Sequence, residues 1–244
     1  MTYGLSIHCN SGIVLSSDSF TNTRQNQGGA DSTRMHRYVW PGNRFIAILS
    51  SGHPDVIAAL NSQLNQDLKE RPDKNLLTVT SLQAVADYIA ETSTQIQKLF
   101  AERGPSIMSY ETSYILAGQI GLQPTETMLI YAQGNYINES EYSPYLQIGD
   151  YKYGKPILDR VVKADLSLAM AARCAMVSMN STMVVDQQTE KTIELLIYKK
   201  DSLNTSTHMV LQKDHPLAKN MAVSWNHGLQ QALTMLPKFA WENY

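Results

Sequence analysis

The chain has few cysteines, no long apolar run and no leader-like segment at its start. Its 244 residues include two cysteines, Cys9 and Cys174. They are too few and too far apart for a disulfide framework or a zinc site. No stretch of about 18 apolar residues is present, so we expect no transmembrane helix. The N-terminus lacks the charged and apolar regions of a signal peptide. These absences predict a cytoplasmic protein that contacts no membrane.

The sequence also lacks an excess of charge of either sign. The net charge is -2, which gives no basic surface for nucleic acid and no acidic tail. Hydrophobic residues make up 43% and charged residues 17%, so we expect a large folded core. The six histidines show no metal-ligand spacing, so we predict no metal and no cofactor. His8 and His36, on or near predicted strands, are expected to be hydrogen-bonded structural residues.

Apolar patterning and turn residues predict strands and helices that come in blocks. Predicted strands are 3–9, 13–17, 38–40, 45–49, 112–118, 126–132, 145–148, 192–199 and 207–211. Predicted helices are 54–70, 80–103, 155–162, 166–182 and 216–236. Asp18 is placed at the end of the second strand, and Thr80 is placed as the cap of the second helix. The segment 166–182 is apolar almost all round and is expected to be buried.

The block order argues against a doubly wound parallel sheet, in which single helices alternate with strands. It predicts an α+β protein with two antiparallel sheets between helical layers. No linker, repeat or low-complexity tract divides the chain, so we expect a single domain over residues 1–244.

Thr2 carries the most distinctive chemistry of the sequence. Removal of Met1 would leave a threonine with both a hydroxyl and a free α-amine of pKa about 7.7–8.0. Such an amine can act as the base that activates the hydroxyl as a nucleophile. An ordinary surface terminus explains Thr2 alone equally well.

The order and spacing of several motifs resemble a known family. The motifs are Thr2-Tyr3-Gly4-Leu5, 12–19, Arg34-Met35-His36, Ser50-Ser51-Gly52, 147–160 and 178–183. In them the chain resembles proteasome β-type subunits of the Ntn-hydrolase superfamily, and more narrowly the bacterial Anbu group, over residues 2–241. The resemblance implies a four-layer αββα sandwich and a homo-oligomer, either a ring or an open spiral.

The resemblance also implies site residues. It makes Thr2 the nucleophile, Asp18 the carboxylate that holds a neighbouring cation, and Gly52 the donor of the oxyanion-hole N–H. Thr21 and Asn22 fall where the family binds the substrate backbone, and Ser50 falls near the substrate side-chain pocket. For Asp18 and Gly52 the simpler interpretations are a strand-end turn residue and a turn glycine before a helix.

Arg34 departs from the family pattern, which has lysine at this position. Arginine stays protonated in proteins, so it can supply a positive field and pair with Asp18 but cannot relay a proton. Other departures affect the supporting groups. Asp150 replaces a serine, and the later aspartate-and-serine support maps only loosely onto Ser178 and Ser181. We therefore expect weak activity.

Three functions remain open from the sequence. The first is a threonine-type hydrolase that cleaves peptides and assembles with itself. The second is an oligomeric scaffold or binding module with an impaired site. The third is an Ntn amidohydrolase that acts on a small amide.

Overall fold

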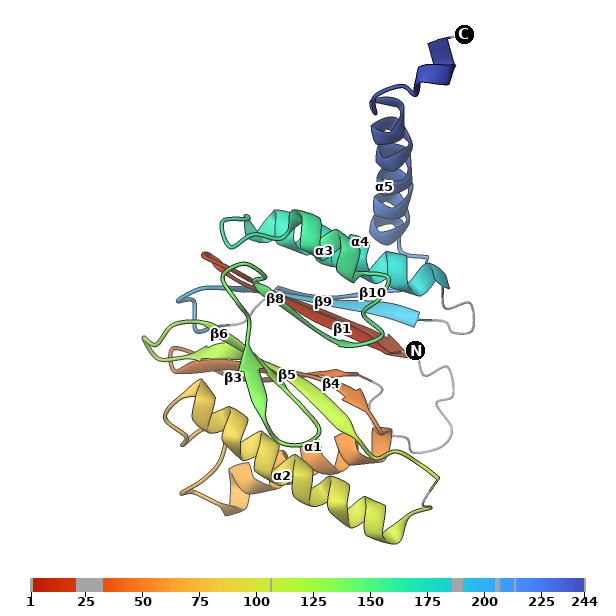
Figure 1. The fold of residues 1–244 in the computed structure, drawn as a ribbon. Coiled ribbons are helices and arrows are strands. Elements are labelled where there is room, and N and C mark those ends of the chain that lie inside the picture. Colours follow the sequence, from red (N-terminus) through yellow and green to blue (C-terminus); the bar gives the residue numbers. More distant parts are fainter. Residues whose placement is uncertain are drawn as a thin grey trace.

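The protein folds as two stacked antiparallel sheets between two layers of helices (Figure 1). The structure is a computed structural model that describes residues 2–20, 33–105, 107–185, 191–204, 207–212 and 214–243. One sheet has the strand order β10-β9-β2-β1-β8, and the other has the order β3-β4-β5-β6-β7. This architecture confirms the predicted α+β sandwich and its antiparallel pairing.

The first sheet contains β1, which directly follows the predicted nucleophile Thr2, and β8, which pairs with the start of β1. Its strands are β1 (Tyr3–Cys9), β2 (Gly12–Phe20), β8 (Tyr145–Gly149), β9 (Lys191–Lys199) and β10 (Thr207–Leu211). The second sheet is built from β3 (Met35–Trp40), β4 (Arg44–Gly52), β5 (Thr112–Ile120), β6 (Glu126–Ile130) and β7 (Tyr136–Asn138). The short strand β7 was absent from the sequence prediction.

The helices are α1 (Pro54–Glu70), α2 (Leu82–Arg103), α3 (Lys155–Val161), α4 (Leu168–Val185) and α5 (Pro216–Thr234), followed by the 3-10 turn Ala240–Asn243. Helix α1 has the predicted bounds. Helix α2 begins differently, because the Ser81 side chain, not Thr80, caps it by accepting a hydrogen bond from the Ala84 N–H. Ser81 occupies the last non-helical position before α2, where its side-chain oxygen can reach the N–H groups of the first turn.

Three apolar clusters fill the spaces between the four layers. One lies between the first sheet and helices α3 and α4, one between the two sheets, and one between the second sheet and helices α1 and α2. Cys9 and Cys174 belong to the first cluster as buried thiols. By length and composition α4 could cross a membrane, but eight of its 18 residues are buried against the sandwich. That packing is typical of a core helix.

Side chains of β1 alternate between two of these clusters. Tyr3, Leu5, Ile7 and Cys9 point toward α4. A Cβ on Gly4 would instead contact Ile148 and Leu49, which pack in the space between the sheets. Because side chains alternate along a strand, Thr2 is expected to share the Gly4 face and to point toward the second sheet.

Candidate active site

Thr2 lies immediately before β1 and is half-buried, with its backbone held by the end of β8. The Asp150 N–H donates to the Thr2 carbonyl at 2.7 Å. Gly149 has a φ of +79°, and a Cβ there would collide with the same Thr2 carbonyl oxygen. Only glycine permits this close approach. The Gly149-Asp150 pair therefore fixes the position of the candidate nucleophile.

Asp18 lies beside the start of β1 and is 1% exposed. Its Oδ1 accepts a hydrogen bond of 2.9 Å from the Tyr3 N–H. The sequence prediction that Asp18 ends its strand is wrong, because β2 continues to Phe20. Pairing with β9 extends the strand through Asp18, which faces Ile193 in the register. The carboxylate is thus held by the sheet rather than by a flexible turn.

Arg34 supplies a cation from the opposite sheet. It lies one residue before β3, and its Nε is 3.6 Å from Asp18 Oδ1. Its carbonyl accepts from the Ser50 N–H at 3.0 Å and the Ser50 hydroxyl at 3.2 Å. Burial lowers the pKa of the Arg34 guanidinium, and the Asp18 charge opposes that change. Arginine stays charged in such surroundings, so Arg34 acts as a fixed positive charge.

Gly52 ends β4 with a φ of +141°. A Cβ at Gly52 would collide with the Glu111 carbonyl and lie 2.6 Å from the Thr112 Cα, so no other residue fits this backbone. The preceding Ser51 places its Oγ 3.2 Å from the position of a Gly149 Cβ. The end of β4 therefore approaches the segment that holds Thr2, as an oxyanion-hole donor would require.

Three residues were predicted to bind substrate: Thr21, Asn22 and Ser50. Thr21 and Asn22 lie outside the described residues. Ser50 is 2% exposed and donates its hydroxyl to the Arg34 backbone. This contact gives Ser50 a role in positioning Arg34. Its predicted place beside the substrate side chain stays a prediction.

Ser178 supports the residue that follows Thr2. Its hydroxyl is 2.7 Å from the Tyr3 hydroxyl, which also accepts from the Gln147 amide at 2.5 Å. Burial is the main cause that raises the pKa of Tyr3 to about 12, so the phenol stays neutral. Ser181 lies further along α4 and is half-buried. The sequence did not point to Tyr3 or Gln147 as supports, although both lie inside the motifs that carried the resemblance.

Asp150 donates a hydrogen bond from its backbone N–H to the Thr2 carbonyl, and its carboxylate is partly buried beside this contact. Within the described part of the chain, Oδ1 of Asp150 is buried with no hydrogen-bond partner. The described residues contain no group of three or more His, Cys, Asp or Glu side chains that could hold a metal ion.

The class follows from these features. An αββα sandwich with a threonine at the start of a central strand, beside a buried carboxylate–cation pair, is the arrangement of a proteasome β-subunit-like protein. No family model and no curated protein matches the sequence. Solved structures do match, and several of them are Anbu proteins.

Three of these structures superimpose on almost the whole chain. "Helical Assembly of the Anbu Complex from Pseudomonas aeruginosa" is 30% identical, covers 98% of each chain and has a TM-score of 0.86. Anbu (ancestral beta-subunit) from Yersinia bercovieri is 29% identical over 98% of this chain and 99% of that one, with a TM-score of 0.86. A Gly-1 mutant of Anbu from Hyphomicrobium sp. strain MC1 is 27% identical, with the same coverages and TM-score. The chain belongs to the Anbu family.

Proposed function

We propose that this protein is an N-terminal threonine hydrolase that cleaves peptide bonds once Met1 has been removed. The observation that supports it best is the buried Asp18 carboxylate. It binds the Tyr3 N–H and lies 3.6 Å from the Arg34 guanidinium, directly beside Thr2. Burying two charges carries a large desolvation penalty. Buried charges are therefore found most often at functional sites, where they change the reactivity of a neighbouring nucleophile.

The proposed reaction uses the two groups of a processed Thr2. The α-amine takes the proton from the hydroxyl, and Oγ attacks the substrate carbonyl. The Gly52 N–H stabilises the developing oxyanion, a contribution of about 2.7–4 kcal/mol for one such donor. The amine then protonates the leaving nitrogen, and the C–N bond breaks. Water, deprotonated by the same amine, releases the acyl group and restores Thr2.

Arg34 is expected to limit this reaction. Its fixed charge favours the hydroxyl's ionised form and keeps Asp18 paired, but it cannot accept or return a proton. The planar fork of five donors is also wider than an ammonium group. Slow turnover on peptides follows from both properties.

We also propose that the protein is cytoplasmic and assembles with itself. The Pseudomonas aeruginosa relative is described as a helical assembly, which supports self-association of this chain. The same Arg34 observation favours a second function, an oligomeric scaffold whose site is impaired. The third candidate, an amidohydrolase for a small amide, uses the same nucleophile and differs in substrate.

The decisive experiment combines intact mass with an electrophile that needs both the hydroxyl and the amine of an N-terminal threonine. We expect purified protein to lack Met1 and to carry the label on Thr2. A preparation that retains Met1 is the matched control and should not react. Protein that keeps Met1 in the producing cell would contradict the hydrolase and favour the scaffold. Labelling with turnover of small amides but not of peptides would favour the amidohydrolase.

A further inference from the structure

Helix α5 is packed differently from the other long helices. It has no buried residue, and Figure 1 shows it projecting away from the sandwich. Among the described residues, only its first half contacts the body of the protein, through Ala218, Met221, Ala222 and Trp225, which are partly buried. These positions follow the i, i+3, i+4, i+7 spacing of a helix face that packs on a neighbour.

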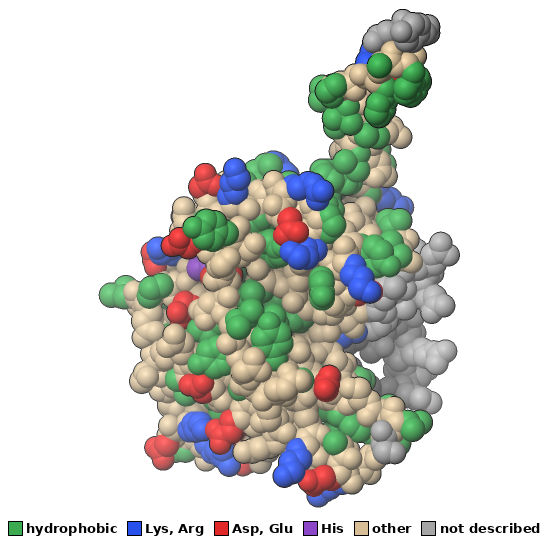
Figure 2. All heavy atoms as spheres, viewed as in Figure 1, with side chains coloured by type: hydrophobic (Ala, Val, Ile, Leu, Met, Phe, Trp, Pro, Cys, Tyr) green, Lys and Arg blue, Asp and Glu red, His purple; other side chains and the backbone are tan. Residues whose placement is uncertain are grey.

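The same face continues beyond the point where the body ends. Its next helical positions are Leu229, Ala232 and Leu233, and Leu236 follows just after the helix; all four are exposed. Leu233 is 67% exposed and Leu236 is 60% exposed. Figure 2 shows hydrophobic side chains along the projecting part. An isolated helix of this length is marginal in water unless its apolar face is covered. The stripe therefore needs a partner that the described part of one copy does not supply.

An aromatic pair extends this apolar surface past the helix. The rings of Phe239 and Trp241 stack with centroids 5.8 Å apart, and the side chains are 66% and 70% exposed. Exposed aromatic anchors of this kind dominate the energy of protein interfaces when they enter a pocket. We call residues 229–241 the overhang.

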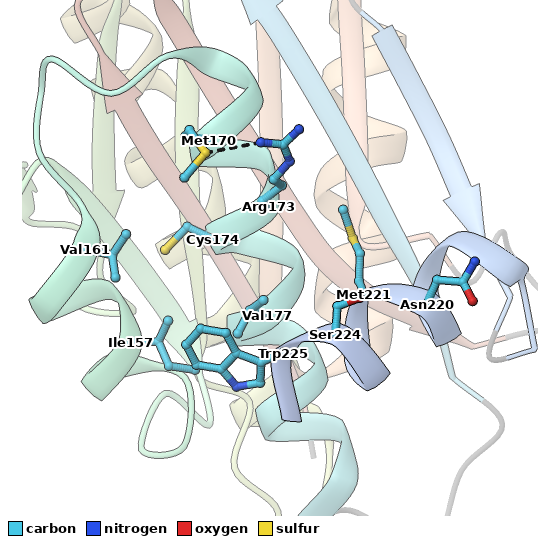
Figure 3. Close-up of a pocket in the computed structure, with 10 residues that line it drawn as sticks. All are labelled: Ile157, Val161, Met170, Arg173, Cys174, Val177, Asn220, Met221, Ser224 and Trp225. Carbon is cyan, nitrogen blue, oxygen red and sulfur yellow. Dashed lines mark hydrogen bonds between the residues drawn. The ribbon is translucent and has the colours of Figure 1, made fainter. Parts of the chain in front are cut away.

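An apolar groove lies at the base of α5, against α3 and α4 (Figure 3). Its volume is about 460 Å³. Ile157 and Val161 line one side, and Cys174 and Val177 form the floor. At the rim Arg173 lies beside Met170, with Nη1 3.2 Å from the sulfur. The groove thus offers an apolar floor with one cation at its edge.

We propose that the overhang of one copy fills the α3–α4–α5 groove of a second copy. The overhang continues the face that already packs on α4 in its own chain, so the same kind of surface fits it. Glu242 directly follows Trp241, and its negative charge is complementary to the positive charge of Arg173 at the rim of the groove. Residues 216–241 contain two lysines and no acidic residue. This is too little charge for a nucleic-acid or anionic membrane partner.

The first test is the assembly state of the full-length Phe239→Ala/Trp241→Ala variant, measured by sedimentation over a range of micromolar concentrations. We expect the wild type to sediment well above 27.3 kDa and the variant to dissociate at least tenfold more readily. Leu122→Ala is the matched control, because Leu122 is 98% exposed and lies in the β5–β6 turn. Its assembly should not change. Wild-type protein that is monomeric, or a double variant that assembles like wild type, would overturn the proposal.

The second test identifies the two surfaces directly. Arg173→Cys and Glu242→Cys are made separately in a Cys174→Ala background, mixed and oxidised. We expect a two-chain disulfide product in the mixture and far less in either preparation alone. Absence of the product from a mixture that still assembles would show that another surface joins the copies.

Discussion

The two ends of strand β1 both carry an acid–base pair that links the two sheets. At the first end, Asp18 of β2 and Arg34 before β3 are 3.6 Å apart. At the other end, His8 of β1 contacts Glu139, which follows β7, through Nδ1. The His8 Nε2 lies 2.8 Å from the Thr125 hydroxyl, and Glu139 also accepts from the Thr127 hydroxyl at 2.5 Å. We call this second group the His8 cluster.

The contacts at the two ends of β1 indicate different roles, one in the proposed reaction and one in stability. In the His8 cluster each ring nitrogen has a direct partner, so the group acts as a clamp between the sheets. The Arg34–Asp18 ion pair instead lies beside Thr2, so its charges can act on the hydroxyl and the amine of that residue. Changes at the Thr2 end should alter chemistry, and changes at the His8 end should alter stability.

The largest effect should come from Thr2→Ala. We expect complete loss of covalent labelling and of any hydrolysis, because the variant has no hydroxyl to attack. The free energy of unfolding in urea should change by less than about 0.5 kcal/mol, since Thr2 is only half-buried and at the chain start. Activity that survives in the variant would exclude Thr2 as the nucleophile.

Arg34→Lys should raise the rate of labelling on the order of 10²-fold, the size of a general-base contribution. Lysine can lose its proton when buried and presents a compact charge. Arg37→Lys is the matched control, because Arg37 is exposed on the neighbouring strand β3 and should leave the rate unchanged. Slower labelling of Arg34→Lys than of wild type would show that the arginine itself serves the reaction.

His8→Ala should instead destabilise the protein by about 1–3 kcal/mol, the cost of leaving a buried acceptor without its partner. The Glu139 side chain is only 13% exposed, so water replaces the lost contact poorly. Urea unfolding measures this cost. The double variant His8→Ala/Glu139→Gln should recover part of it, because the unpaired charge is gone. Thr2 labelling should be unaffected in both.

Much of the fold could be predicted from the sequence because local signals agreed with tertiary packing. Helix α1 has its predicted bounds, and the expectation that His8 and His36 are hydrogen-bonded structural residues is confirmed by the partners Glu139 and Asn61. Strand β7 was missed because its three residues are set by pairing with β6, not by a pattern of their own. The projection of α5 was also unforeseen, since an apolar stripe looks the same whether its cover is the same chain or another.

The candidate site, like the fold, was predicted from the sequence only in part. The ordered motifs predicted which residues meet at the start of β1, and the contact between Asp18 and Arg34 is present. The roles of Thr2 and Gly52 in a reaction stay predictions. The backbone contact of Asp150 with Thr2 and the packing of Ser178 against Tyr3 depend on strand register and helix position. Residue types alone do not give those.

The smallest expected effect is on the pH dependence of stability, and it comes from Glu139 of the His8 cluster and its neighbour Glu126. Burial raises the pKa of Glu139, but hydrogen bonds from His8 and Thr127 and the charge of His8 outweigh it, so the pKa is lowered overall. Glu139 therefore stabilises the fold above its unfolded pKa of about 4.3, and this stability is lost as the pH falls through the folded pKa.

Glu126 has the opposite sign. Burial, and then the charge of Glu139, raise its pKa, so its contribution is present at low pH and is lost as the pH rises. The two effects partly cancel in the wild type over the acid range around the unfolded glutamate pKa of about 4.3. Glu126→Gln should make the acid loss of stability steeper than in wild type, and Glu139→Gln should make it shallower, as measured by urea unfolding across this range. Equal slopes in all three proteins would show that the His8 cluster does not couple to protonation, and that the clamp holds the sheets by hydrogen bonding alone.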